Sequence, residues 1–140
     1  KVSTGGVSLP CGAANWALEV QMSDPKLYQG GCHCGKVRYE VKTGLEPVIS
    51  CNCSICSKSG YWLTFVPEKD IKLLSGSDDL ADYQFNKKHI HHVFCKACGV
   101  RSFAKGTSPD GVTMIAVNVR CLDDIDLSSI KPAPFDGKSL

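Results

Sequence analysis

Three tight groups of cysteines constrain this chain more than any other sequence feature. The chain has nine cysteines in 140 residues. Seven of them fall in three groups, which are Cys32 with Cys34, then Cys51, Cys53 and Cys56, and finally Cys95 with Cys98. An odd total does not suit complete disulfide pairing, and cysteines two or three positions apart rarely reach the geometry of a disulfide. The spacing therefore predicts metal binding, and with it a reducing, cytoplasmic location.

The two outer groups together supply enough ligands for one closed metal site. Structural zinc takes four tetrahedral ligands, with a Zn–S distance of about 2.3 Å. Gly35 and Gly99 directly follow the two pairs, at positions where a metal-binding turn needs a residue without a Cβ atom. The site expected to result is a four-thiolate structural zinc held by Cys32, Cys34, Cys95 and Cys98.

The central group is one ligand short of a closed site. Catalytic zinc is typically held by three protein ligands, which leaves a position for water or substrate. Cys51, Cys53 and Cys56 therefore predict a catalytic zinc, which makes two zinc ions in the chain. Alternatively, Cys121 or one histidine of the segment HIHHVF (residues 89–94) closes the site. An iron–sulfur cluster is a further alternative, although the spacings match no usual ferredoxin pattern.

The segments between the cysteine groups predict a mainly β domain. In KVRYEVK (residues 36–42), Val37, Tyr39 and Val41 alternate with charged residues, which is typical of a half-buried strand. One helical turn is expected within residues 121–130, and an irregular tail after it. Further short strands separated by turn residues are expected at 46–50, 61–67, 70–76, 80–85, 89–94 and 111–119.

Length and charge limit the kinds of partner. The formal net charge of +2 is too small to indicate a nucleic-acid surface, and no apolar run reaches the roughly 20 residues that span a bilayer. Met22 opens a plausible native start, so residues 22–140 are expected to form a single zinc domain. Residues 1–21, which contain Cys11, are expected to be an extension from an expression vector or an upstream sequence.

Four segments carry a resemblance to a known family. These are YQGGCHCGKVRYEV, CNCSICSKSGYWLTFVP, LLSGSDDLADYQFNKKHIHHVFCKACGVRSF and VNVRCLDDIDL. Across residues 27–128 the chain resembles the glutathione-dependent formaldehyde-activating enzyme family, also called the GFA or centromere-protein-V family. The resemblance implies a β-tent fold, in which antiparallel sheets meet at an edge with zinc-binding cysteine knuckles. It also implies a structural zinc on the outer pairs and a catalytic zinc on the central three cysteines, the same partition that ligand counting gives.

The resemblance implies a carbon–sulfur lyase similar to S-hydroxymethylglutathione synthase. Its partners would be a small-molecule thiol, glutathione, and an aldehyde, formaldehyde. The chemistry suits an open zinc site, because a free thiol with a pKa of about 8.5 is mostly protonated at neutral pH. Zinc deprotonates a thiol that it coordinates or polarises a carbonyl oxygen. Two alternative functions remain: an enzyme with the same scaffold and another small-molecule substrate, or a non-enzymatic zinc module that binds a protein.

Residues that contact the substrate are less clearly marked. Ser57 stands where many members of the family carry arginine, so the substrate contacts are expected to differ there. Strand alternation predicts His89 and His91 on one face and His92 on the other, each a candidate general base. Tyr61 and Trp62 are candidate walls of a substrate groove. Candidate cations for the carboxylates of glutathione, each otherwise an ordinary solvated charge, are Lys58, Arg101, Lys105 and Arg120.

Overall fold

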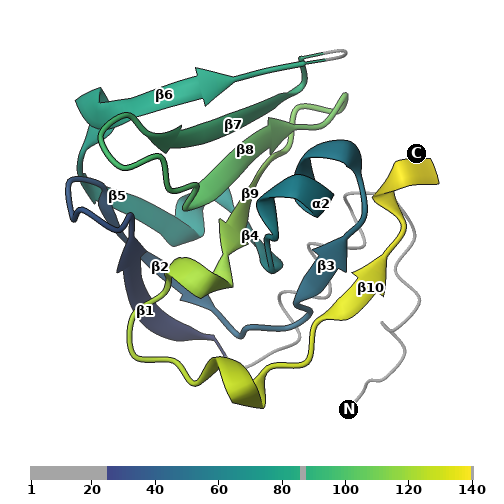
Figure 1. Cartoon of the computed structure of the whole chain (residues 1–140), viewed down its shortest axis with the longest axis horizontal. Helices are drawn as coiled ribbons and strands as arrows, with labels where there is room; N and C mark the ends of the chain where they lie inside the picture. The colour runs from purple at the N-terminus through teal and green to yellow at the C-terminus, as the bar shows by residue number, and fades with distance from the viewer. Residues whose placement is uncertain (1–24, 86–87, 140) are drawn as a thin grey trace.

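Two β-sheets dominate the computed structural model, which describes residues 25–85 and 88–139 (Figure 1). The smaller sheet is antiparallel, has the order β1–β2–β5, and consists of β1 (Lys26–Gly31), β2 (Arg38–Thr43) and β5 (Ile71–Ser75). The larger sheet has the order β10–β3–β4–β9–β8–β7–β6. Its strands are β3 (Ile49–Cys51), β4 (Leu63–Pro67), β6 (Leu80–Tyr83), β7 (Ile90–Cys95), β8 (Phe103–Thr107), β9 (Thr113–Asn118) and β10 (Ala133–Phe135). The predicted mainly β, two-sheet class is confirmed.

The structure corrects the prediction at two places and adds strands at two others. The helix α2 (Ser54–Ser59) follows Cys53, where no helix was expected, because six residues are too few to show a helical period. β10 lies in the tail that was expected to be irregular, and it pairs in parallel with β3. β1 and β8 were not predicted either, because each contains glycine and little alternation. No helix among the described residues is long and apolar enough to cross a membrane.

Short 3-10 turns connect several of the strands. One of them, η5 (Leu127–Ser129), is the single helical turn expected within residues 121–130. The others are η2 (Glu68–Asp70), η3 (Ser77–Asp79), η4 (Val119–Cys121) and η6 (Gly137–Ser139). The predicted N-terminal extension with Cys11 lies outside the described residues, so the proposed domain boundary stays a prediction.

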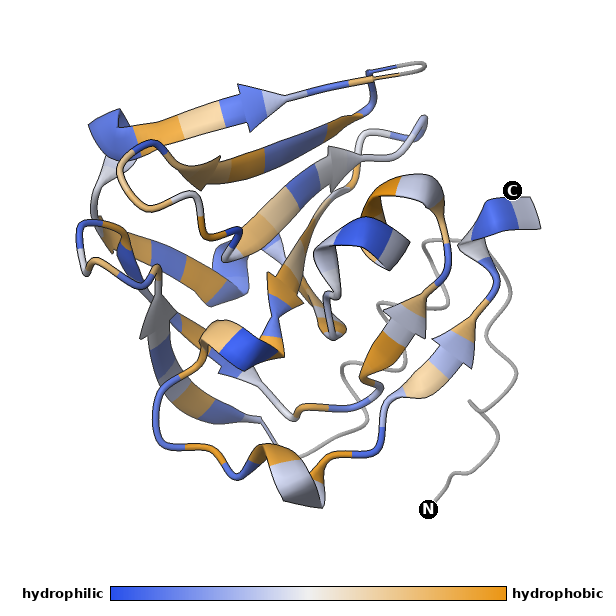
Figure 2. Cartoon of the chain, viewed as in Figure 1, coloured by the Kyte–Doolittle hydropathy of each residue, from blue (hydrophilic) through white to orange (hydrophobic). Residues whose placement is uncertain are grey.

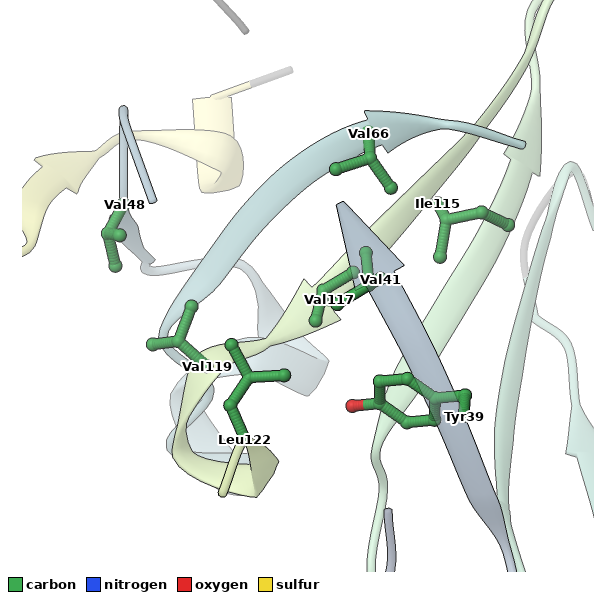
Figure 3. Close-up of a cluster of buried hydrophobic side chains, with 8 residues drawn as sticks. All are labelled: Tyr39, Val41, Val48, Val66, Ile115, Val117, Val119 and Leu122. Atoms are coloured by element: carbon green, nitrogen blue, oxygen red, sulfur yellow. The ribbon is translucent and has the colours of Figure 1, made fainter. Parts of the chain in front are cut away.

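The main core lies between the two sheets. Tyr39 and Val41 of β2 are fully buried against Val66 of β4 and against Ile115 and Val117 of β9 (Figure 3). The Tyr39 ring meets the Phe103 ring edge-on, with centroids 5.7 Å apart. Its hydroxyl donates a hydrogen bond to the Ser102 carbonyl at 3.3 Å, which satisfies the only polar atom of this side chain inside the core.

The opposite face of the large sheet is also apolar. Along β9, Ile115 and Val117 face the core, whereas Met114 and Ala116 line a cavity on the other side. Figure 2 accordingly shows β9 in hydrophobic colours over most of its length, while hydrophilic residues interrupt β2. This explains why residues 111–119 are the strongest apolar run of the sequence: alternate side chains of one strand serve two apolar environments.

We expect Ile115→Ala to destabilise the protein by about 2–5 kcal/mol, because it leaves a cavity in the core between the sheets. Leu74→Ala is the matched control, since the Leu74 side chain is 46% exposed, and should change the free energy of unfolding by less than about 0.5 kcal/mol. Equilibrium denaturation in urea measures both. Equal losses from the two variants would contradict this assignment of the core.

Candidate metal centres

Four cysteine sulfurs meet where the two sheets come together. Cys32 and Cys34 lie in the turn between β1 and β2, Cys95 ends β7, and Cys98 follows it. The Sγ atom of Cys34 is 3.6 Å from that of Cys32 and 3.7 Å from that of Cys95, and all four sulfurs lie within 4.8 Å of one another. Ligands at about 2.3 Å from a tetrahedral zinc are about 3.8 Å apart. The sulfur spacing therefore fits one metal ion.

The backbone around this cluster has the form of two metal-binding turns. The Val37 amide donates to Cys32 Sγ at 3.3 Å, and the Ala97 amide donates to Cys95 Sγ at 3.4 Å. Gly35 and Gly99 adopt φ values of 87° and 80°, in the left-handed region that favours glycine, as the sequence predicts. N–H groups directed at sulfur stabilise its thiolate form, which is the form that binds a metal.

The electrostatics of the four thiols call for a cation. The amides of Val100 and Cys34 lower the pKa of the Cys98 thiol to about 6. The Lys36 amide favours the Cys34 thiolate, yet desolvation and the neighbouring sulfurs raise the pKa of Cys34 to about 11. Near neutral pH the four thiols therefore cannot all ionise unless a positive ion compensates their repulsion, so the donor set fits a divalent metal.

The second centre lies at the junction of β3 and α2. Cys51 ends β3, Cys53 immediately precedes α2, and Cys56 lies buried within the helix. The three sulfurs lie within 4.8 Å of one another, and the Cys53 amide donates to Cys51 Sγ at 3.5 Å. Burial raises the pKa of the Cys56 thiol, and the nearby Cys53 and Cys51 raise it further. Three thiolates at this spacing would repel one another, so this group also fits a bound metal ion, whose positive charge compensates the repulsion.

Neither alternative fourth ligand joins these three sulfurs. Among the described residues, no other cysteine, histidine or carboxylate atom belongs to the group. The Cys121 thiol lies 3.7 Å from the carbonyl oxygen of Arg101. Burial raises the pKa of Cys121 to about 11, and charges on Cys32 and Cys98 of the first centre add to the effect. The part of the chain that the structure describes therefore leaves the second centre with three protein ligands.

The C-terminal segment is held close to the second centre by Asn52, a residue between two of the ligands. The backbone nitrogen of Asn52 donates a hydrogen bond to the Phe135 carbonyl at 3.1 Å, and its side-chain Nδ2 donates one to the Asp136 carboxylate at 3.0 Å. In return, the Lys138 amide donates to Asn52 Oδ1 at 2.8 Å. Sequence reasoning missed this contact, because its partners are more than 80 positions apart.

Gly137 completes this closure over the metal ligands. A Cβ atom at position 137 would collide with Cys51 Sγ and would touch the Cβ atom of Cys53. The backbone thus approaches the ligand so closely that only glycine fits. A glycine followed by lysine in an apparently irregular tail gave no signal of this role.

A cavity of about 910 Å³ opens next to the second centre. Cys51, Cys53 and Cys56 line one part of it, and both His89 and His92 border it as well. His91 instead turns away, and its Nδ1 lies 2.6 Å from a carboxylate oxygen of Asp82. The predicted pairing of His89 with His91 on one face is therefore wrong, because β7 begins only at Ile90 and strand alternation does not extend to His89.

His92 is the more confined of the two cavity histidines. It is 6% exposed, and its ring stacks on Phe85 with centroids 5.3 Å apart. Its Nδ1 is buried and has no hydrogen-bond partner among the described residues. Burial lowers the pKa of His92, and the nearby Arg101 lowers it further, so the imidazole is neutral at neutral pH.

Only two of the four candidate cations come together. Lys58 and Arg101 border a smaller hollow of about 410 Å³, together with Asn118. Tyr61 borders both this hollow and the large cavity, and its buried hydroxyl makes no hydrogen bond of ordinary geometry with the described residues. Lys105 and Arg120 lie elsewhere: Lys105 pairs with Glu68 at 2.8 Å, and Arg120 lies 4.3 Å from the ring centroid of Trp62. Arg101 makes a similar contact, with its guanidinium 4.9 Å from the ring centroid of Phe94.

Two β-sheets with one group of four and one group of three clustered cysteines define a small β protein with two candidate metal sites. The profile of the GFA family, described as glutathione-dependent formaldehyde-activating enzyme, matches residues 27–134, and the chain belongs to this family.

Two relatives place the chain more closely. A curated protein of Halomonas elongata, provisionally named a glutathione-dependent formaldehyde-activating enzyme, is 35% identical over 81 residues. The match covers 51% of this chain and 52% of that protein, which is about half the length of each. The crystal structure of a Rhodobacter sphaeroides protein from structural genomics superimposes with a TM-score of 0.68 at 28% identity. It covers 76% of this chain and 97% of its own, which supports the two-sheet fold.

We expect Gly137→Ala to weaken metal binding at the three-cysteine centre, because the added Cβ atom displaces Cys51 Sγ. Changes beside metal ligands typically weaken affinity about 10–100-fold. Competition with a chromogenic chelator measures zinc affinity, and thermal unfolding shows whether the fold persists. Lys138→Ala is the control, since it keeps the backbone hydrogen bond to Asn52. Equal zinc affinity in Gly137→Ala and the wild type would contradict the close approach.

We expect the pKa of His92 to lie below its usual value of about 6.5. The unfolded chain then binds more protons than the folded protein just below pH ~6.5, so stability rises with pH there. The contribution of His92 is full above about pH 6.5 and is lost as the pH falls through the folded pKa. NMR titration of the imidazole gives the pKa, and urea unfolding of His92→Gln should show a flatter pH dependence. A folded pKa of 6.5 or higher would contradict the burial argument.

Proposed function

We propose that the protein is a zinc-dependent carbon–sulfur lyase of the formaldehyde-activating type, which adds a small thiol such as glutathione to an aldehyde. The observation that carries the proposal is the three-cysteine centre, which borders a cavity and gains no fourth ligand from the described residues. A closed centre would favour a non-enzymatic module instead. Family membership and the name of the Halomonas elongata relative support the same reaction.

The reaction forms one bond and moves one proton. The thiol sulfur bonds to the carbonyl carbon, the C=O π bond breaks, and the proton leaves sulfur and ends on the former carbonyl oxygen. Zinc held by Cys51, Cys53 and Cys56 would supply Lewis acidity, which makes a carbonyl more electrophilic or a thiol more acidic. The second zinc, held by the four-cysteine centre, would link the two sheets without taking part in the reaction.

The residues around the cavity provide the remaining functions. His92 is a neutral imidazole beside the cavity and can take up and return the proton, and His89 is a second candidate. Ser57 donates to the Cys53 carbonyl at 2.9 Å, so it stabilises the first turn of α2 and offers no positive charge at a position where the resemblance implies arginine in many family members. Lys58 and Arg101 supply positive charge in the small hollow next to the cavity, where they bind a carboxylate of the thiol.

A reducing compartment suits this chemistry. All eight described cysteines are free thiols, and seven of them belong to the two candidate metal centres. A cytoplasmic location is consistent with that state.

Proton NMR exchange spectroscopy, which follows the conversion of glutathione between its free form and its formaldehyde adduct, tests the proposed function directly. Glutathione and formaldehyde form their adduct spontaneously, so the measured quantity is the exchange rate with and without protein. An increase that depends on protein concentration and disappears in Cys53→Ala supports the proposal. Exchange at the spontaneous rate with zinc-loaded protein, for every aldehyde and thiol tried, would overturn it.

The two centres should respond differently to loss of one ligand. We expect the wild type to contain two zinc ions per chain by elemental analysis. Cys98→Ala should lower stability strongly, because it opens a metal link between the two sheets. Cys53→Ala should keep most of the stability and one zinc ion but lose activity. Calorimetric unfolding measures the difference, and equal destabilisation by the two variants would contradict separate structural and catalytic roles.

A further inference from the structure

The large cavity has an apolar floor built by strand alternation. Each contributing strand of the large sheet sends alternate side chains away from the main core and toward the cavity. β9 contributes Met114 and Ala116, while its intervening residues belong to the core. The other strands that contribute are β3 with Ile49, β4 with Leu63 and Phe65, β8 with Ala104 and β7 with Ile90.

The walls of the cavity are apolar as well. α2 contributes Ile55, and the C-terminal segment contributes Phe135. At the rim, Ile90 is 46% exposed and Val112 is 45% exposed. Large aliphatic side chains that remain exposed beside a concave apolar surface are typical of a site that a ligand covers.

Charged groups are scarce around this cavity. Among the described residues that line it, only Lys88 and Lys138 carry a fixed charge, and no carboxylate or arginine does. The uncharged polar side chains of the lining are the three cysteines, the two histidines, Tyr61 and the hydroxyl residues Ser54, Thr107 and Ser108. The cations Lys58 and Arg101 border the separate small hollow instead. The large cavity is thus mainly apolar with two lysines, whereas the small hollow is mainly polar.

Size and polarity together indicate what the cavity takes. Its volume of about 910 Å³ lies in the range of pockets that hold small organic molecules, roughly 300–1,000 Å³. Formaldehyde has no hydrocarbon body to fill it. Glutathione is charged at both ends and polar along its length, so apart from contacts with Lys88 and Lys138 it would lose water against apolar walls without gaining partners. An uncharged molecule with a hydrocarbon body is the ligand that this lining stabilises.

We propose that the electrophile of this enzyme is an apolar aldehyde of medium chain length, with its hydrocarbon body in the cavity and its carbonyl group at Cys51, Cys53 and Cys56. The inference rests on the proposed function and specifies its second substrate. The thiol adds to the aldehyde carbon, and its proton passes to the carbonyl oxygen to give a thiohemiacetal. No oxidant or reductant is needed.

The first experiment measures binding without chemistry. Unreactive primary alcohols from butan-1-ol to octan-1-ol are titrated calorimetrically into the full zinc-loaded chain. Each added methylene should tighten binding about threefold to fourfold, the ratio that corresponds to about 0.8 kcal/mol per buried CH₂. Affinity that does not increase with chain length would overturn the proposal. Binding that weakens as protein concentration rises would assign the cavity to a second copy of the chain, and would overturn it too.

Variants locate the binding in the cavity. Ala116→Leu fills the floor and should abolish octan-1-ol binding, while Ala133→Leu on exposed β10 should leave it unchanged. Val112→Asp places a charge at the exposed rim, where it cannot disturb the core, and should weaken binding at least tenfold. Thermal unfolding verifies that each variant is folded. Wild-type affinity in the folded Val112→Asp variant would overturn the location.

Exchange NMR with a thiol then separates this inference from the proposed function. The inference predicts a higher kcat/KM for octanal than for formaldehyde, with the advantage lost in Val112→Asp. Acceleration with formaldehyde but not with octanal would overturn the inference and leave the proposed function standing. Chain-length-dependent binding without acceleration for any aldehyde would overturn the proposed function, and with it the role of the ligand as electrophile.

Discussion

The packing of the small sheet against one face of the large sheet is the contact on which the rest of the structure depends. Tyr39 and Val41 fill that interface from one side, and Val66, Ile115 and Val117 fill it from the other (Figure 3). All five are almost completely buried, and each such side chain contributes roughly 1.5–3 kcal/mol relative to an exposed one. Because successive side chains of a strand point to opposite faces, this core uses only half of the residues in β4 and β9. The other half remains available for the floor of the cavity.

The two metal centres lie on different sides of this arrangement, and their surroundings distinguish them. The four-cysteine centre joins the β1–β2 turn of the small sheet to the end of β7 in the large sheet. Four sulfurs suffice for a closed tetrahedral site, so a metal bound there would stabilise the contact between the sheets. The three-cysteine centre lies on the β3–α2 junction, beside the cavity and under the C-terminal segment that Asn52 holds. A ligand set of three beside a cavity suits substrate binding.

The polarity of the surface around the second centre is divided in a way that suits two different reactants. Lys58 and Arg101 border a small, mainly polar hollow, whereas the larger cavity is mainly apolar and has two lysines, Lys88 and Lys138, in its lining. Tyr61 borders both and is the physical link between them. Under the proposed function, a charged thiol and an uncharged aldehyde would bind in these two environments and meet at the three cysteines.

The sequence alone determined the local cysteine groups that are the candidate metal ligands of this protein. A single turn brings together the sulfurs of cysteines two or three residues apart, so each local group could be predicted from its spacing. Counting ligands predicted that the two outer pairs join, and the tertiary structure brings Cys34 to within 3.7 Å of Cys95. The short apolar segments likewise determined the mainly β class, since alternation is a local property. Such patterns did not predict α2 or β10, because elements of six and three residues are too short to show a period.

The tertiary structure decided everything that depends on distant partners. It brought Asn52 and Gly137 together over the second centre, turned His91 toward Asp82, and left His92 beside the cavity. It also decided which face of β9 meets the core and which meets the cavity. Both faces of this strand are apolar, so the sequence alone does not distinguish them. Alternation specifies that a strand has two faces, but only the packing of one sheet on another specifies what each face contacts.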